Sequence, residues 1–251
     1  PTPHAEILAE AAKLLKPQGY VLKIVEYSDY VQPNVALDSK ELDANYFQHK
    51  PYLDDFNAQK GTKLGSMGPV HYEPFGIYAG KTKSLKDLKD GALVAVPNDA
   101  TNYGRALLVL RDAGLLELGE YEGTPLEENI TSSKVELYPV NASMTYQYLS
   151  DVDAAVINGN YAASYGVDPD SGIFDESIDL SDDKFTCLIA CRTADLDNET
   201  YKRVAEVFCS EVTSKVVEEK FNGFFKLVWE EDAAEDAADT ETEVSSETTE
   251  G

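Results

Sequence analysis

The sequence is poor in cysteine and in long apolar runs. Its three cysteines, Cys187, Cys191 and Cys209, are an odd number and supply no disulfide framework. Cys187 and Cys191 would lie on one face of a single strand, where a disulfide is poorly placed, so we expect buried free thiols. No apolar run approaches the ~20 residues of a membrane span, and no signal-peptide pattern is present.

Basic residues are also scarce. Against 46 Asp and Glu there are 21 Lys and Arg, which gives a formal net charge of −25. This balance argues against nucleic acid as a partner and against unaided adhesion to anionic membranes. Residues 230–251 carry ten of the acidic residues with no basic or aromatic residue, so we predict a disordered acidic tail there.

The remaining chain alternates helices and strands. At 251 residues with 43% hydrophobic content, it is long enough for one large or two small domains. The hydrophobic pattern predicts strands over residues 20–27, 75–79, 93–96, 134–138, 154–158 and 185–191. It predicts helices over residues 3–16, 101–113, 142–150 and 198–210, capped by Thr2 and Asp197 at the first and last of these, with a loop over 119–133. This alternation predicts an α/β fold with mostly parallel sheets.

The segment from Val94 to Arg105 is the most informative stretch. It reads Val-Ala-Val-Pro-Asn-Asp-Ala-Thr-Asn-Tyr-Gly-Arg, a buried strand that leads through a loop into a helix. Backbone N–H groups at a helix start favour anions, and an arginine nearby can bind a carboxylate through two hydrogen bonds. The alternative is a surface helix capped by Thr101 or Asn102, with Arg105 facing solvent.

Two further segments point to a binding site. Leu42–Tyr52 concentrates aromatic residues and His49, and Asp151–Tyr161 ends a buried strand at the amide of Asn158. Their weak similarity indicates two similar lobes that deliver side chains from strand ends. An aromatic box with an arginine and an asparagine suits a small zwitterion with an apolar tail. If Tyr30, Phe47 and His49 do not line such a site, the alternatives are a rim position for Tyr30, a core position for Phe47 and an ordinary loop histidine at His49.

At these residues the chain resembles the NlpA/MetQ family of methionine-binding lipoproteins, the substrate-binding components of ABC importers. The resemblance covers roughly residues 1–229 and rests on the following segments in family order: Pro3-His-Ala-Glu-Ile-Leu8, Ser28-Asp-Tyr30, Pro33-Asn34, Leu42-Asp-Ala-Asn45, Phe47-Gln-His-Lys-Pro-Tyr-Leu53, His71-Tyr-Glu-Pro74, Val96-Pro-Asn-Asp99, Thr101-Asn-Tyr-Gly-Arg105 and Ala155-Val-Ile-Asn158. The combination is specific, whereas no single segment is.

The resemblance implies a two-lobed type II periplasmic-binding-protein fold. Lobe one would comprise residues 1–79 plus 188–229, and lobe two residues 80–187. Family members carry a signal peptide, a lipid-modified cysteine and a first strand ahead of the Pro-His-Ala-Glu motif, so the resemblance implies that these are missing from this chain. It further implies a bacterial, extracytoplasmic protein, anchored to the membrane by an N-terminal lipid absent here, with an ABC permease and its ATPase as partners and no cofactor or metal.

The resemblance also assigns roles to residues. Arg105, assisted by Asn102, would hold the carboxylate of methionine or a similar amino acid, and Asn158 would accept from its ammonium group. Tyr30, Phe47, His49 and Tyr52 would shape the side-chain pocket. One departure concerns Cys187, which stands in Phe185-Thr-Cys-Leu-Ile189 where methionine binders carry an asparagine. A thiol is a poor substitute for an amide that donates and accepts, so a dipeptide or another small amino acid stays open as the ligand.

Two other functions compete with this interpretation. One is a hydrolase or transferase with Cys187 or Cys191 as nucleophile and His49 as base. Against it, no orienting carboxylate or amide pattern accompanies His49, and no metal-ligand spacing or phosphate loop occurs. The other is a surface adhesin of the same fold that has lost transport. We therefore expect a binding protein and not an enzyme.

Overall fold

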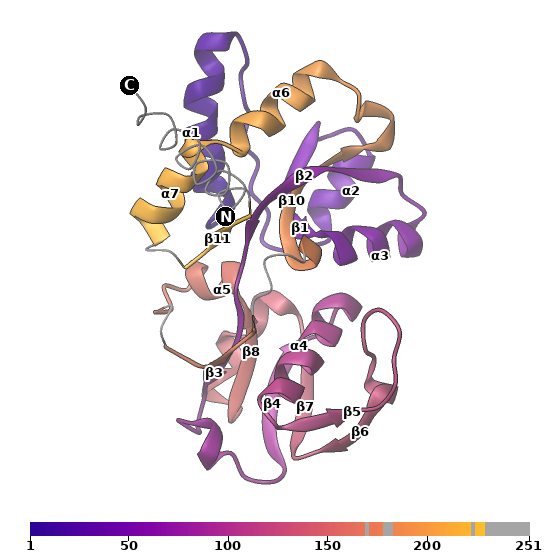
Figure 1. Ribbon diagram of the computed structural model, residues 1–251, viewed down its shortest axis with the longest axis vertical. Coiled ribbons are helices and arrows are strands. Elements are labelled where there is room, and N and C mark those ends of the chain that lie inside the picture. Colours follow the sequence, from indigo (N-terminus) through magenta and orange to yellow (C-terminus); the bar gives the residue numbers. More distant parts are fainter. Residues whose placement is uncertain (169–170, 178–182, 222–223, 229–251) are drawn as a thin grey trace, which may run out of the picture.

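Two β-sheets organise the chain, one in each of two lobes stacked along the long axis of the molecule (Figure 1). The computed structural model describes residues 1–168, 171–177, 183–221 and 224–228. The predicted acidic tail over 230–251 lies outside the described residues. We call the lobe that contains the N-terminal helix the first lobe and the other the second lobe.

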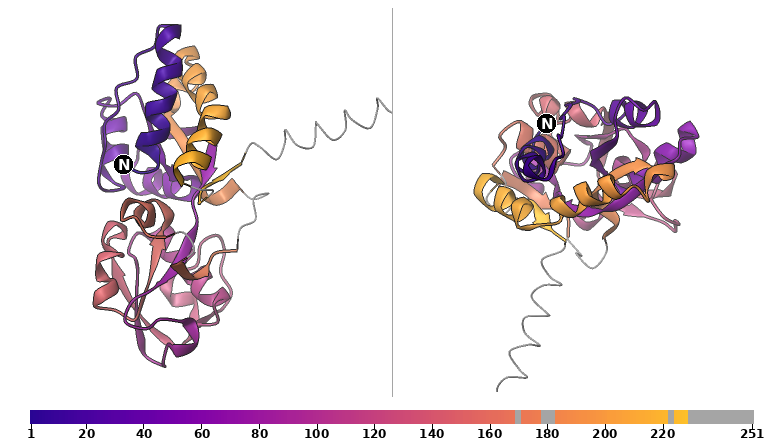
Figure 2. Two further views of the ribbon diagram at one scale, coloured as in Figure 1. Left: turned by 90° about the vertical axis from the view of Figure 1, so that its left-hand side faces the viewer. Right: turned by 90° about the horizontal axis from the view of Figure 1, so that it is seen from above.

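The first lobe is built on a four-stranded sheet in the order β1-β10-β2-β11. Its strands are β1 (Ala44–His49), β2 (Leu64–Tyr72), β10 (Thr186–Arg192) and β11 (Lys226–Leu227). Its helices are α1 (His4–Leu15), α2 (Gln32–Asp38), α3 (Lys50–Lys60), α6 (Glu199–Phe208) and α7 (Glu211–Phe221), with short 3-10 helices at Lys16–Gln18 and Thr193–Asp195. Helix α1 packs against α6 and α7, as Figure 2 shows for the indigo and orange-yellow helices.

The second lobe is built on a five-stranded sheet in the order β7-β4-β8-β3-β9. Its strands are β3 (Phe75–Ala79), β4 (Ala92–Pro97), β7 (Val135–Val140), β8 (Ala154–Asn158) and β9 (Gly172–Asp175), with β5 (Leu116–Leu118) and β6 (Ile130–Ser133) forming a separate hairpin. Its helices are α4 (Ala100–Asp112) and α5 (Gly159–Ser164), with 3-10 helices at Leu85–Asp87, Glu127–Asn129, Ala142–Met144 and Gln147–Ser150. A further 3-10 helix, Asp183–Phe185, leads into β10.

The predicted mostly parallel sheets are wrong, because both sheets are mixed or antiparallel. All strand pairs of the first lobe, β1 with β10 and β2 with β10 and β11, are antiparallel. In the second lobe β4 pairs in parallel with β7 and β8, but β3 pairs antiparallel with β8 and β9. The two segments that connect the lobes run in opposite directions, so the strands next to them are antiparallel. The alternation of helix and strand along a chain does not reveal which strands pair.

The crossings also lie elsewhere than predicted. Strand β3 pairs with β8, so residues 75–79 belong to the sheet of the second lobe, whereas the sequence interpretation placed them in lobe one. Thr186 and Cys187 pair with β2 in the first lobe, although they were assigned to lobe two. The first crossing is thus Glu73-Pro74, between β2 and β3. The lobe of a strand is decided by the strands it pairs with, and the residues of the strand itself do not reveal those partners.

Several local predictions change at helix starts. The N-cap of α1 is Pro3 rather than Thr2, whose hydroxyl donates to Glu6 at 2.7 Å. The N-cap of α4 is Asp99, which accepts from the Asn102 N–H at 3.0 Å, and not Thr101 or Asn102 as in the alternative interpretation. The N-cap of α6 is Asn198 and not Asp197. At the starts of α4 and α6 several residues able to cap stand close together, so the sequence does not single one out; at α1 the N-cap makes no side-chain hydrogen bond.

Two other predicted elements differ. Residues 142–150 form two 3-10 turns instead of one helix, and the loop over 119–133 contains part of a hairpin. Residues 20–27 are assigned no strand, although their side chains alternate between partly buried Tyr20 and Leu22 and exposed Val21 and Val25. Within the described residues β1 is the first strand.

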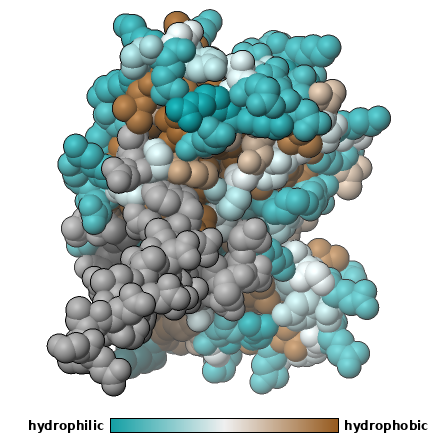
Figure 3. Space-filling view, turned by 45° about the horizontal axis from the view of Figure 1, so that its top comes forward, coloured by the Kyte–Doolittle hydropathy of each residue, from teal (hydrophilic) through white to brown (hydrophobic). Residues whose placement is uncertain are grey.

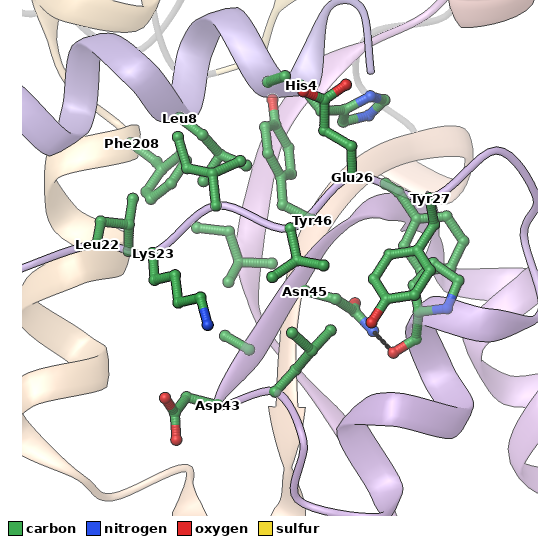
Figure 4. Close-up of a pocket in the computed structure, with 18 of the residues that line it drawn as sticks. His4, Leu8, Leu22, Lys23, Glu26, Tyr27, Asp43, Asn45, Tyr46 and Phe208 are labelled. Atoms are coloured by element: carbon green, nitrogen blue, oxygen red, sulfur yellow. Dashed lines mark hydrogen bonds between the residues drawn. The ribbon is translucent and has the colours of Figure 1, made fainter.

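A large cavity lies beside this extended segment, mostly within the first lobe, with α5 of the second lobe at its edge. It measures about 390 Å³ and is lined by residues 20–30, by β1 and by side chains such as Leu8 and Phe208 (Figure 4). Figure 3 shows brown hydrophobic residues among hydrophilic ones on this lobe. Only two of the predicted ligand residues, Tyr30 and Phe47, reach this cavity, so it is not the predicted binding site.

Close packing around Gly104 of α4 generates a stability prediction. A Cβ at this position would lie 2.2 Å from Thr124 Cγ2 and 2.5 Å from the Pro125 carbonyl oxygen. Alanine normally stabilises a helix interior relative to glycine by about 1 kcal/mol, but overpacking costs about 1–3 kcal/mol and backbone cannot yield easily. We expect Gly104→Ala to lower the free energy of unfolding, measured by urea denaturation. A more stable variant would contradict this packing.

Candidate functional site

A small cavity lies at the junction of the two lobes, and all eight predicted ligand residues line it. Its volume is about 20 Å³, enough for about one water molecule and too small for an amino acid. The lining consists of Tyr30, Phe47, Gln48, His49, Tyr52, Glu73, Asn102, Arg105, Asn158, Phe185 and Cys187. We call it the interlobe cavity.

Both lobes contribute to the interlobe cavity. The first lobe supplies Tyr30 ahead of α2, Phe47 and His49 from β1, Tyr52 from α3 and Cys187 from β10. The second lobe supplies Asn102 and Arg105 from the first turns of α4 and Asn158 from the end of β8. Strand ends and helix starts from separate parts of the chain therefore meet here, as the sequence motifs predicted; what each residue does for a ligand is a separate question.

An amide network joins the two lobes at this cavity. Asn102 Oδ1 accepts from Asn158 Nδ2 at 2.9 Å and lies 3.3 Å from Nε2 of His49, on the opposite lobe. Asn102 Nδ2 donates to the Asp99 carboxylate at 2.9 Å, which fixes which way the amide faces. Among the described residues, the buried Asn158 Oδ1 has no hydrogen-bond partner. A buried acceptor without a partner is costly, so this oxygen is poised for a donor from outside the chain.

His49 is held as a neutral donor. Its Nδ1 accepts from the backbone N–H of Tyr52 at 3.2 Å, because the ring caps the start of α3. Nε2 therefore carries the proton that faces Asn102 Oδ1. Burial, together with the positive charge of Arg105, lowers the pKa of His49 from 6.5 to about 3. The alternative of an ordinary loop histidine does not hold, since the ring bridges the lobes.

Arg105 is buried, with 2% of its surface exposed, so the alternative that it faces solvent is wrong. Its Nε donates to Glu176 Oε1 at 2.9 Å and its Nη2 to Glu176 Oε2 at 2.5 Å. Nη2 also lies 3.2 Å from Tyr72 Oη and 3.0 Å from the Glu73 carbonyl oxygen. None of these bonds uses Nη1. The rings of Phe75 and Phe185 lie 4.7 Å and 4.6 Å from its central carbon.

Aromatic rings form the other wall. The Tyr30 ring lies 5.9 Å from those of Phe47 and Tyr52 and 5.0 Å from that of Tyr161, measured between centroids. Tyr30 Oη donates to Asn160 Oδ1 at 2.7 Å, and Tyr52 Oη donates to the Tyr30 carbonyl oxygen at 3.0 Å. Because the hydroxyls of Tyr30 and Tyr52 are hydrogen-bonded within the protein, their aromatic rings stay available to contact an apolar ligand group.

Sequence reasoning missed several residues of this site. Gln48, Glu73 and Phe185 line the cavity, and Glu176 and Tyr72 hold Arg105. Glu73 is the most consequential, because burial alone raises the pKa of its carboxyl but His4, His71 and Arg105 bring it below the usual value. The segment His71-Tyr-Glu-Pro74 contained a signal for Glu73, since it was among the family motifs. Nothing in the sequence marked Glu176.

A polar and aromatic cavity enclosed between two α/β lobes is the arrangement of a bilobed binding protein. Comparison with known proteins identifies which kind. The NlpA lipoprotein family matches residues 1–229. The chain is 38% identical over 229 residues to the methionine-binding lipoprotein MetQ of Bacillus subtilis, covering 88% of this chain and 83% of that protein. This chain belongs to the NlpA lipoprotein family.

Solved structures agree with this assignment. A nutrient binding protein from Burkholderia cenocepacia bound to methionine superposes with a TM-score of 0.84 at 38% identity, covering 90% of this chain and 95% of that one. An ABC transporter periplasmic substrate-binding protein from Coxiella burnetii superposes with a TM-score of 0.84 at 30% identity, covering 90% and 96%. The mixed α/β fold is thus shared with binding proteins of this kind.

The low pKa of His49 predicts how stability depends on pH. An unfolded chain binds a proton at this histidine below pH 6.5, whereas the folded protein does so only near pH 3, so acidification favours unfolding within that window. The loss from one such group approaches about 1.4 kcal/mol per pH unit. We expect His49→Gln to lose less stability than the native protein between pH 6.5 and 3 in urea denaturation. Parallel pH profiles would show that His49 is protonated when folded.

Proposed function

We propose that this protein is the substrate-binding component of an ABC importer and encloses methionine, or a related small amino acid or dipeptide, between its lobes. The observation that carries the proposal is the buried Asn158 Oδ1, which has no hydrogen-bond partner among the described residues and lies in a cavity that Arg105 also lines. Family membership and the names of the relatives support the same function. The protein would bind and release its ligand without chemistry.

The cavity chemistry fits a zwitterion. Asn158 Oδ1 would accept from the ligand ammonium, and the neighbouring Glu73 carboxylate supplies negative charge on that side. Arg105 Nη1 would donate to the ligand carboxylate, since Nε and Nη2 are bonded to Glu176. Tyr30, Phe47 and Tyr52 offer ring faces and edges, which favour a polarizable thioether. The charged groups of the ligand would thus contact polar side chains, and its apolar side chain would contact the aromatic rings.

Entry of the ligand requires the lobes to separate. A cavity of about 20 Å³ cannot hold an amino acid, and the His49–Asn102 contact spans the lobes. Few covalent connections oppose such a movement: the direct crossing at Glu73-Pro74 and the return from β9 to β10. We propose the two lobes as the moving domains of a type II binding-protein arrangement, with ligand contacts completed on closure.

The partners follow from this role. A closed, loaded protein would dock on an ABC permease driven by an ATPase, the system to which the Coxiella relative is assigned by name. The family's description as lipoproteins supports a lipid anchor that holds the protein at the outer side of a bacterial cell membrane. Within the described residues no helix is long and apolar enough to cross a membrane.

The geometry gives an enzyme no support. A nucleophilic cysteine needs a lowered pKa, whereas burial raises the pKa of the Cys187 thiol well above its usual value and also raises that of Cys191. A general base should titrate near the working pH, yet the pKa of His49 is about 3. Cys187 and His49 line the same cavity, but neither is tuned for nucleophilic catalysis.

Calorimetric titration tests the proposed function directly. The protein is unfolded and refolded to release retained ligand, which is identified by mass spectrometry, and then titrated with L-methionine, D-methionine and glycyl-methionine. Saturable binding of one molecule per chain without turnover supports the proposal. Absence of binding for all three, or conversion of any of them to product, would contradict it.

Asn158→Leu tests the ammonium contact. The two side chains have similar size, but leucine removes the buried acceptor, and a hydrogen bond to a charged group is worth about 1.5–3 kcal/mol. We expect methionine affinity to fall at least about tenfold in calorimetry. Asn198→Ala, at the N-cap of α6, serves as the control and should bind as the native protein does. Equal affinities in all three proteins would remove Asn158 from the site.

Arg105→Lys tests the carboxylate contact. A lysine supplies the charge but not the planar group that reaches Glu176, Tyr72 and a ligand at once. We expect binding to be nearly abolished and the free energy of unfolding to fall, because breaking a buried ion pair costs about 3–5 kcal/mol. Calorimetry and urea denaturation measure the two effects separately. Native affinity in a destabilised variant would mean that Arg105 serves the fold alone.

A further inference from the structure

Four metal-ligating side chains meet behind the interlobe cavity. They are His4 from α1, His71 from β2, Glu73 directly after β2 and Cys187 from β10, all buried, and their ligand atoms lie within 4.8 Å of one another. Glu73 Oε1 is 3.1 Å from His71 Nε2 and 3.3 Å from His4 Nε2. We call this group the His-Glu-Cys cluster. Apart from His71 and Glu73, its members are far apart in the sequence, which explains why no metal spacing was visible there.

We propose that the His-Glu-Cys cluster binds a divalent transition metal ion, with Zn²⁺ as the best chemical match. Imidazole, carboxylate and thiolate are the ligands that zinc takes in proteins, whereas magnesium and calcium take oxygen. Tetrahedral zinc with bonds of about 2.0–2.3 Å separates its ligand atoms by about 3.3–3.8 Å. Two of the separations already fall near that range, so a shift of about 1 Å by the remaining donors completes the geometry.

One possible metal-ligating atom of the cluster makes no hydrogen bond within the described residues. Among the described residues, the buried His4 Nε2 has no hydrogen-bond partner, because its approach to Glu73 is not aligned as a hydrogen bond. A metal ion at the centre would take this nitrogen as a ligand. The charges also balance, since a divalent cation offsets one carboxylate and one thiolate while both histidines stay neutral.

A second layer of contacts orients the cluster. Tyr46 Oη lies 2.5 Å from His71 Nδ1, on the side of the ring away from Glu73. A proton on Nδ1 donated to Tyr46 leaves the Nε2 lone pair directed at the cluster, as metal-binding histidines generally require. The rings of His4 and His71 pack at 5.4 Å between centroids, and that of His4 packs at 4.8 Å from Tyr46. The ligands are therefore held by packing from three elements.

The cluster is reachable from two cavities. His4 and Tyr46 line the large cavity of the first lobe, where Figure 4 shows them next to each other. Glu73 and Cys187 line the interlobe cavity on the other side. A metal ion can therefore enter without unfolding the lobe. The site would also border the proposed ligand cavity, but its metal binding stands independently of whether methionine binds there.

The test uses the full chain, stripped of metal with a chelator, and the metal alone as probe. Zn²⁺ binding is measured by calorimetry, and Co²⁺ is added as a spectroscopic substitute that gives a near-ultraviolet charge-transfer band when a thiolate ligates it. We expect one ion per chain and this band in the native protein. Cys187→Ser should lose the band and at least tenfold in Zn²⁺ affinity.

Matched cysteine variants are the controls. Cys191→Ser removes a buried thiol from the same strand, and Cys209→Ser removes an exposed thiol; neither belongs to the cluster, so both should keep the band. His4→Gln is a second test that leaves every thiol in place, with circular dichroism to verify folding, and it should also lose at least tenfold in affinity.

Four results would overturn the proposal. One is no Zn²⁺ binding by the native protein. Another is binding without a thiolate band, which would place the metal on acidic surface groups. The third is a band that survives Cys187→Ser, and the fourth is native affinity in a folded His4→Gln variant. Each would mean that the cluster is a buried hydrogen-bonding network only.

Discussion

The buried guanidinium of Arg105 is the constraint on which the junction of the lobes depends. A buried cation has to be paired and hydrogen-bonded, and the partners of Arg105 come from both crossing regions: Tyr72 at the end of β2, Glu73 directly after it, and Glu176 after β9. Helix α4 is thereby fixed against the segments that connect the lobes. Asp99 orients Asn102 at the start of the same helix, so the anchoring of α4 also positions the cavity amides.

Around this anchor, the two lobes divide the requirements of a zwitterionic ligand. The second lobe presents the guanidinium and the Asn158 oxygen, which no other described residue hydrogen-bonds, and the first lobe presents most of the aromatic rings. Neither half suffices alone, because the cavity lies between them. Neutral His49 joins them through Asn102, a contact without net charge that is cheap to break on opening. Membership of the NlpA lipoprotein family agrees with this division of roles.

Sequence reasoning predicted the meeting of the site residues but not the contacts that hold them. Asn102, Arg105 and Asn158 follow strands at helix starts, and such positions gather at one sheet edge by geometry alone. Strand direction was misjudged, because the pairing of β2 with β10 joins segments more than a hundred residues apart. The bond between Arg105 and Glu176 could not be predicted for the same reason. The sequence contains many acidic residues, and nothing in it shows which of them is buried. The His-Glu-Cys cluster likewise exists only after folding.

A crystal structure of the protein grown with methionine tests the central claim most directly. We expect one methionine in an enlarged interlobe cavity, with its ammonium within hydrogen-bond distance of Asn158 Oδ1 and its carboxylate on Arg105. The thioether would lie among Tyr30, Phe47 and Tyr52. Methionine in the large cavity of the first lobe, or in the interlobe cavity with its carboxylate away from Arg105, would contradict the account.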